Sequence, residues 1–197
     1  MAASSTLDRR HAVSSMLAGR GDALVVTGLG SPTWDVAAVS ESPLNFYLWG
    51  AMGGAAMVGL GLALAQPSRR VIVITGDGEL LMGLGSLATI GVARPSNLAI
   101  AVLDNERYGE TGMQASHTAR GVDLAAIATA SGFPAAATVS TGDALTSWLP
   151  TLHRARGPVF GVIKVAANQP ALTVPARDGT YIKNRFREAL LGPKAVL

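Results

Sequence analysis

The sequence predicts an α/β fold: a doubly wound, mostly parallel sheet flanked by helices and formed by a single domain over residues 1–197. Short apolar runs rich in β-branched residues, such as 71–75 and 98–103, are typical of buried parallel strands. Stretches of helical length alternate with these runs, which is the pattern of an α/β sheet. No linker or internal repeat divides the chain, and its length suits about one domain.

In the N-terminal third of the sequence we expect one helix before the first strand and one helix after it. Residues 8–18 are expected to be helical, 23–27 to form the first strand and 33–39 a short helix. Residues 52–65, rich in glycine and alanine, are expected to form a helix that stops near Pro67, because proline cannot continue a helix.

The C-terminal half repeats the alternation. After Asn105 we expect a long polar loop with three glycines, ending at Gly121. The elements expected beyond it are a helix at 122–131, a strand at 136–139, a helix at 143–156, a last apolar strand at 159–165 and a terminal helix at 181–191. Residues 1–7 are expected to be a flexible N-terminus, and 166–197 a C-terminal extension that carries the last helix.

Two polar segments follow the central strands and are expected to meet. Gly76-Asp77-Gly78-Glu79 comes directly after strand 71–75, and Asn105 follows strand 98–103. A helix over 80–92 rises roughly 20 Å at about 1.5 Å per residue, enough to return along a strand of about 3.3 Å per residue. Asp77 and Asn105 therefore emerge at the same carboxyl edge, where open parallel sheets bind ligands.

The residue types at this edge suit a metal-bound diphosphate. Asp77 offers an anionic oxygen and Asn105 an amide oxygen, which fits a Mg²⁺-like cation that keeps positions for phosphate oxygens. The N–H groups of Gly78 and Glu79 would point at the anion from a helix start, and Gly76 and Gly78 permit the sharp turn. The alternative is an ordinary strand-to-helix turn, with Asp77 as N-cap and Asn105 in an Asx turn.

These residues carry a family resemblance. Gly-Asp-Gly followed, after the 26 residues from Glu79 to Asp104, by Asn105 resembles the signature of thiamine-diphosphate (ThDP) enzymes. Gly50-Ala51-Met52-Gly53 is similar to a G-x-M-G segment of ThDP-dependent decarboxylases and acetohydroxyacid synthases. Residues 104–114 resemble the equivalent part of sulfopyruvate and phosphonopyruvate decarboxylases. The resemblance spans about residues 20–165 and implies the ThDP-binding fold.

The resemblance implies ThDP and Mg²⁺ as cofactors. Asp77, the side chain of Asn105 and the carbonyl of Arg107 would bind the metal. Met52 would lie between the two cofactor rings and hold the bent form, for which an unbranched apolar side chain is suited; its alternative role is core packing. The full set of expected cofactor contacts is Gly28, Gly50, Met52, Gly76, Asp77, Gly78, Glu79, Asn105, Arg107 and Tyr108.

The turn after the first strand resembles a dinucleotide fingerprint only superficially. Gly28-Leu29-Gly30-Ser31-Pro32 lacks the third glycine, because Thr33 occupies that position, and an NAD site is disfavoured. We therefore expect Gly28 to be a turn residue near the cofactor.

The loop from Tyr108 to Thr118 is expected to contact the substrate, because it follows the metal ligand and is polar. Its candidates are Glu110, Thr111, Gln114 and His117. Together with Met52, Glu110 and His117 form the expected catalytic set. His117 would deliver a proton after CO₂ departs, because histidine is the commonest general acid in enzymes; the alternative is that it anchors the loop.

One part of the expected active site is missing from the chain. ThDP enzymes of this kind activate the cofactor with a glutamate from a separate pyrimidine-binding module, and no second module is present. The resemblance therefore implies a partner (alpha) subunit and a hetero-oligomer such as α2β2 or larger, inert without that partner. Hydrophobic residues at 49% against 15% charged residues agree with a chain that buries surface in an interface.

Composition argues against other classes. A net charge of +3 is too small to indicate nucleic-acid binding, and Lys183, Arg185 and Arg187 are expected on a solvated or partner-facing helix side. The absence of cysteine excludes disulfides and cysteine-ligated clusters within the chain. The 20 uncharged residues 46–65 contain five glycines, and we expect a buried interface helix there instead of a membrane span. With no apolar signal core, a cytoplasmic location is expected.

The resulting hypothesis is the catalytic beta subunit of a ThDP-dependent 2-oxoacid decarboxylase acting on a 3-substituted pyruvate. Sulfopyruvate is the preferred substrate and phosphonopyruvate the next. The alternatives are a ThDP-dependent carboligase subunit, a non-catalytic ThDP-binding scaffold subunit and a protein that binds a nucleotide in place of ThDP.

Overall fold

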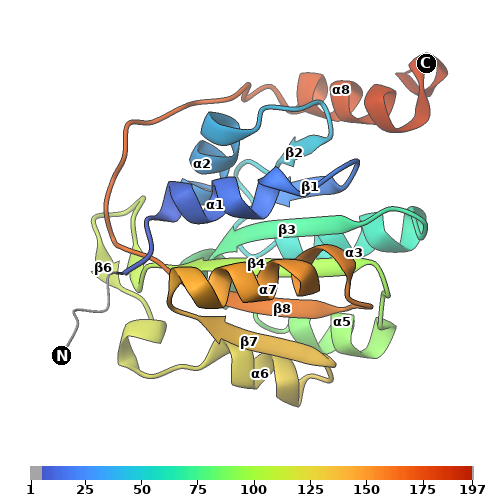
Figure 1. Ribbon diagram of the computed structural model, residues 1–197. Coiled ribbons are helices and arrows are strands. Elements are labelled where there is room, and N and C mark those ends of the chain that lie inside the picture. Colours follow the sequence, from blue (N-terminus) through green and yellow to red (C-terminus); the bar gives the residue numbers. More distant parts are fainter. Residues whose placement is uncertain (1–5, 197) are drawn as a thin grey trace.

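The computed structural model, which describes residues 6–196, is a three-layer α/β structure with a six-stranded parallel sheet at its centre (Figure 1). The strand order is β2-β1-β3-β4-β8-β7, and every neighbouring pair is parallel. The six strands are β1 (Leu24–Thr27), β2 (Asn45–Tyr47), β3 (Val71–Gly76), β4 (Leu98–Asp104), β7 (Ala135–Val139) and β8 (Val159–Lys164). The predicted fold class is confirmed.

Helices cover both faces of the sheet. The helices are α1 (Arg9–Ala18), α2 (Ser31–Val39), α3 (Ala55–Ala65), α4 (Asp77–Met82), α5 (Ser86–Ala93), α6 (Leu124–Ala130), α7 (Gly142–Arg154) and α8 (Gly179–Leu191), with short 3₁₀ turns at Thr118–Arg120 and Pro193–Val196. Side-chain caps fix several starts: Asp8 accepts a hydrogen bond from the His11 N–H at α1, and Asp178 from the Tyr181 N–H at α8.

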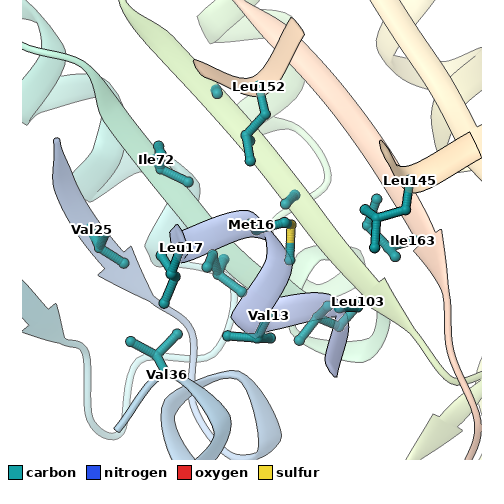
Figure 2. Packing of buried hydrophobic residues seen from close by; sticks show 14 of the residues in the cluster. Val13, Met16, Leu17, Val25, Val36, Ile72, Leu103, Leu145, Leu152 and Ile163 are labelled. Carbon is teal, nitrogen blue, oxygen red and sulfur yellow. The ribbon is translucent and has the colours of Figure 1, made fainter. Parts of the chain in front are cut away.

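Each face of the sheet has its own apolar core, because successive side chains of a strand point to opposite faces. Ile72 and Ile74 of β3 lie in the cluster beneath α1, α2 and α7, whereas Val71 and Val73 lie in the cluster beneath α3 to α6. Figure 2 shows part of the first cluster, in which α1 places Met16 over the strands. Strands buried on both faces explain the uninterrupted apolar runs in the sequence.

The order of the strands creates a switch point between β1 and β3. From β1 the chain moves outward to β2, then returns to β3 on the other side of β1 and continues to β4. The loops after β1 and β3 consequently leave the sheet in opposite directions, and a crevice forms between them at the carboxyl edge. These are the loops that carry Gly28 and Asp77.

Three local predictions were wrong. Strand β2 was missed: the uncharged stretch 46–65 contains part of β2 and a turn before the helix predicted over 52–65, which is α3 and begins at Ala55. The expected helix 80–92 is two helices, α4 and α5, separated at residues 83–85. The expected open loop 106–121 contains the two-stranded hairpin β5 (Arg107–Tyr108) and β6 (Gln114–Ala115).

The C-terminal extension crosses the molecule as an extended strap before α8 (Figure 1). In the strap, the Ala171 carbonyl accepts a hydrogen bond from Arg10 at 2.8 Å, and the Ala176 carbonyl accepts one from Trp49 at 3.0 Å. On α8, Lys183 and Arg187 are exposed, as expected for a solvated or partner-facing helix side, whereas Arg185 is half-buried and pairs with Glu41 at 2.5 Å.

The N-terminus differs in part from its prediction. Residues 1–5 of the segment expected to be flexible lie outside the described residues, whereas Leu7 is buried and bridges Val165. None of the helices within residues 6–196 combines the length and hydropathy needed to cross a membrane.

Candidate active site

A cavity of about 430 Å³ lies at the switch point. A volume of this size is typical of small-molecule and cofactor sites. The residues that line it are Arg9, Leu29, Ser31, Pro32, Met52, Gly76, Asp77, Gly78, Glu79, Met82, Leu103, Asn105, Arg107, Tyr108, Gly109, Glu110, Thr111 and Gln114. The structure thus brings the two predicted strand ends and most of the predicted loop residues to one cavity.

Asp77 is the buried carboxylate of this cavity. It opens α4 directly after β3, with Gly76 rather than Asp77 itself as the N-cap, and it is 2% exposed. Two hydroxyls reach the same oxygen, Oδ2: Ser116 donates at 2.5 Å, and Thr118 lies at 3.2 Å and shares its single proton between Asp77 and Asp104. Among the described residues Oδ1 receives no side-chain hydrogen bond, and this oxygen is available for a ligand.

Burial disfavours the charged form of the Asp77 carboxylate as long as no cation is bound beside it. Desolvation raises the pKa of Asp77 to about 6, the Ser116 hydrogen bond opposes the rise, and the charge of Asp104 adds to it. A bound divalent cation reverses this balance, because it favours the charged form of its ligand. Asp77 therefore has the properties expected of a carboxylate that is completed by a metal ion.

A second buried acid, Asp104, supports the first. Its Oδ1 accepts hydrogen bonds from Thr118 at 2.8 Å and from the Glu106 N–H at 3.0 Å, and its Oδ2 pairs with Lys164 at 2.9 Å. Lys164 pairs with Asp104 across the ladder of β4 and β8. Although burial opposes its charge, hydrogen bonds to Glu106 and Asp104 raise the pKa of Lys164. The sequence analysis missed Asp104, Lys164 and the two hydroxyls.

Asn105 is held in a turn beside the cavity. Its Oδ1 accepts a hydrogen bond from the Arg107 N–H at 3.0 Å, which is the Asx turn considered as the alternative. Asn105 also lines the cavity, and a carbonyl oxygen has a second lone pair. The Asx turn therefore orients the amide without removing its capacity to bind a cation.

Glu79 acts through its side chain, which the sequence analysis did not foresee. The carboxylate is 3% exposed; Oε1 accepts the N–H groups of Gly53 at 2.8 Å and Ala55 at 3.2 Å, and Oε2 accepts the Thr75 hydroxyl. These bonds tie the turn that carries Met52 to the start of α4. Met52 is 39% exposed and lines the cavity, and this position disfavours a core-packing role.

Gly78 approaches an aromatic ring too closely for any side chain. A Cβ atom there would meet the Tyr108 ring at 2.6 Å. Tyr108 is in turn placed by the β5–β6 hairpin, and its hydroxyl lies 3.3 Å from Nδ1 of His117. The hairpin and α4 are therefore in direct contact at the cavity wall.

Three predicted site residues do not line the cavity. Gly28 lies behind it, where a Cβ atom would meet the Thr75 hydroxyl at 2.8 Å and the Glu79 carboxylate at 3.1 Å. Gly50 is exposed in a left-handed conformation, φ 69°. His117 is exposed and contacts the site through Tyr108. The contacts predicted for these residues and the catalytic roles of Met52, Glu110 and His117 stay predictions.

We expect loss of the Ser116 and Thr118 hydroxyls to weaken metal binding by about tenfold each, because partners that orient a metal ligand contribute on that scale. The measurement is a Mg²⁺ titration of Ser116→Ala and Thr118→Val at fixed ThDP. Thr146→Ala is the matched control, since that exposed hydroxyl donates only to the Gly142 carbonyl. Equal Mg²⁺ affinity in all three variants would contradict the orienting role.

Residues 28–163 match the family model "Thiamine pyrophosphate enzyme, C-terminal TPP binding domain". The match covers more than half of the chain and includes both strand ends of the site. The chain belongs to this family.

Particular relatives cover most of the chain. It is 37% identical over 186 residues to sulfopyruvate decarboxylase subunit beta of Methanothermobacter thermautotrophicus, covering 94% of this chain and 97% of the relative. It is 38% identical over 175 residues to phosphonopyruvate decarboxylase of Streptomyces viridochromogenes, covering 88% of this chain and 44% of that protein.

Solved structures share the fold. A putative thiamin diphosphate-dependent enzyme from Mycobacterium smegmatis superposes with a TM-score of 0.72 at 24% identity, over 83% of this chain and 32% of that one. Benzoylformate decarboxylase from Polynucleobacter necessarius gives 0.69 at 18% identity, over 84% and 34%. The sheet and its helices therefore share the fold of about a third of each of these longer chains.

Proposed function

We propose that the chain is the cofactor-binding subunit of a two-chain ThDP-dependent decarboxylase that converts a 3-substituted pyruvate, sulfopyruvate first, to an aldehyde and CO₂. The observation that carries the proposal is the convergence of Asp77 and Asn105 on one cavity at the switch point. The near full-length similarity to a sulfopyruvate decarboxylase beta subunit supports the substrate and the subunit role.

The donor set fits a magnesium-bound diphosphate. One buried carboxylate and one amide oxygen, with the Arg107 carbonyl next along the hairpin, are hard oxygen ligands of the kind that Mg²⁺ takes alongside phosphate oxygens. Within residues 6–196 no cluster of three or more acidic or histidine side chains could hold a metal by itself. This is consistent with an ion that depends on the diphosphate for its remaining ligands.

The residues of the chain would hold the cofactor and shape its surroundings. Asp77 and Asn105 would bind Mg²⁺, the N–H groups of Gly78 and Glu79 would bind the diphosphate, and Met52 would press between the rings. When bound, ThDP supplies the electron sink that decarboxylation of a 2-oxo acid requires. The mostly apolar cavity wall around Met52, Met82 and Leu29 would exclude water.

A partner chain completes the site in this proposal. The beta-subunit name of the relative implies an alpha subunit, which would supply the activating glutamate. We propose a hetero-oligomer in the cytoplasm, with Mg²⁺ as the metal. Phosphonopyruvate decarboxylation is the second candidate function, because a relative of that activity is 38% identical to this chain.

The test is turnover by the separate and the combined chains. We expect no CO₂ release from sulfopyruvate by the chain alone, and ThDP- and Mg²⁺-dependent release after co-purification with the chain encoded beside it. Parallel assays with phosphonopyruvate and pyruvate rank the substrates, and an acceptor aldehyde reveals carboligation. Robust turnover by the isolated chain would refute the two-chain proposal.

A further inference from the structure

A second cavity of about 390 Å³ adjoins the first at the carboxyl edge. The two cavities share Arg9, Ser31, Asn105, Gly109 and Glu110, so they meet along one wall. The second cavity touches the proposed metal site only at Asn105, because none of Asp77, Gly78 and Glu79 lines it. Its outer wall is the strap, residues 168–172, and its only charged lining residues are Arg9 and Glu110.

Arg9 is a buried cation aimed at this junction. It is 4% exposed, its Nε donates to Asp35, and its Nη1 donates to the Asn168 carbonyl at 3.2 Å. Among the described residues its Nη2 has no hydrogen-bond partner. Nη2 is not one of the fully buried side-chain atoms that lack a partner, so it reaches the open space of the cavities and can donate to a ligand there.

The charge on Arg9 is only partly compensated. Asp35, which is 0% exposed, also accepts a hydrogen bond from Arg10 at 3.1 Å, so two guanidinium groups share one carboxylate. The next carboxylate, Asp8, forms no ion pair with Arg9 but lies near it and accepts a hydrogen bond from the Asn168 amide at 3.0 Å. Arg10 donates its other hydrogen bond to the carbonyl of Ala171 in the strap wall, and it does not itself line either cavity.

The carboxylate in the second cavity does not neutralise Arg9 directly. Glu110 is exposed, and its Oε1 accepts a hydrogen bond from Trp34 Nε1 at 3.2 Å. No ion pair between Glu110 and Arg9 is formed within the described residues. The polar neighbours Ser31, Asn105 and Gln169 supply further hydrogen-bonding groups at the same cavity.

We propose that Arg9 and the second cavity form a subsite for a tetrahedral oxyanion, the sulfonate or phosphonate at C3 of the substrate. A planar guanidinium matches such groups and is always charged. The inference rests on the proposed function for the identity of the substrate, and it assigns the anion-binding residue that the sequence left open. Cofactor phosphate is the other source of the same chemistry, but its expected ligands lie in the first cavity.

Binding to the full chain tests the subsite without any turnover. The probes are 3-sulfopropanoate, which has the sulfonate and carboxylate but cannot react, and magnesium pyrophosphate, each titrated by calorimetry. We expect Arg9→Lys to weaken the binding of 3-sulfopropanoate at least tenfold and the binding of magnesium pyrophosphate less than twofold. Arg10→Lys, the matched control at the same Asp35, should change both less than threefold, and melting curves establish that each variant is folded.

A second pair of variants avoids the buried ion cluster. Gln169 is exposed at the rim of the second cavity and makes no hydrogen bond within residues 6–196. Gln169→Glu should weaken 3-sulfopropanoate binding and Gln169→Lys should strengthen it, each by about threefold or more, with pyrophosphate unchanged.

The outcomes separate the sources of the anion. If Arg9→Lys weakens the binding of magnesium pyrophosphate instead, Arg9 binds a phosphate of the cofactor, and the proposal of a substrate subsite is wrong. Equal losses in Arg9→Lys and Arg10→Lys, or no effect of charge at Gln169, would also overturn it. Because these are binding measurements, an absence of decarboxylation in the combined chains would count against the proposed function alone.

Discussion

Replacing Asp77 by alanine is expected to abolish turnover of the combined subunits, by at least about 1,000-fold, which corresponds to about 4 kcal/mol of lost stabilisation. Asp77 is the only carboxylate in the proposed metal set, and the cation loses its one anionic protein ligand. The measurements are CO₂ release and the affinities for Mg²⁺ and ThDP, obtained by calorimetry on the same preparation.

The fold of the Asp77 variants should survive. Burial already disfavours the charged carboxylate in the metal-free chain, as the raised pKa of about 6 indicates. Asp77→Asn keeps the shape and the hydrogen bonds to the two hydroxyls, and we expect it to melt no lower than the unmodified chain. Asp22→Ala is the surface control, because its side chain is 82% exposed.

The same variants discriminate catalysis from scaffolding. Lost turnover in an intact Asp77→Ala complex supports a catalytic subunit. Lost assembly, with no turnover detected in any preparation, supports a scaffold. Unchanged turnover with normal ThDP affinity would remove Asp77 from the site altogether.

The sheet and the two strand ends were predictable because burial dictates them. Strands covered on both faces must be apolar throughout, so 71–75 and 98–103 stand out from their surroundings, and the parallel pairing then places Asp77 and Asn105 at one edge. In the structure Gly76 of β3 pairs with Leu103 of β4, so the ends of the two strands lie side by side.

The supporting polar residues were not predictable in the same way. Ser116 follows β6 and Thr118 begins a 3₁₀ turn, neither of which has a periodic sequence pattern, and their contact with Asp77 depends on how the β5–β6 hairpin folds back. For Lys164 the sequence carries a weak indication, because this residue ends the last apolar strand in the same way as Asp104 ends β4. Pairing these two ends required the strand order, in which β8 lies beside β4 although β7 precedes it in the chain.

The break between α4 and α5 also depends on a contact that the sequence does not display. Gly53 and Gly83 approach through their backbones: a Cβ atom on Gly53 would meet the Gly83 nitrogen at 2.7 Å, and one on Gly83 would overlap the Gly53 carbonyl. Gly53 adopts a positive φ of 86°, which an L-residue with a side chain rarely accepts. The helical connection between β3 and β4 breaks at Gly83 because the turn at Gly53, next to Met52, occupies the space that a continuous helix would need.

Gly83→Ala should therefore destabilise the chain by about 3 kcal/mol, at the upper end of the range for overpacking, because the obstructing atoms are backbone and cannot rotate away. In a chain of this length that lowers the melting temperature by about 6–12 °C. Displacement of the Gly53 turn also moves Met52, so ThDP affinity should fall in whatever fraction remains folded.

Gly85→Ala is the matched control, two residues further along the same break. Gly85 has φ −60°, and a Cβ atom there would have no neighbour within 4 Å, so alanine should be neutral or stabilise by up to about 1 kcal/mol. Equal melting temperatures for the two variants would mean that the Gly53–Gly83 approach is loose. In that case Met52 would be positioned by the Glu79 hydrogen bonds alone, and Glu79→Gln would become the variant that separates cofactor affinity from stability.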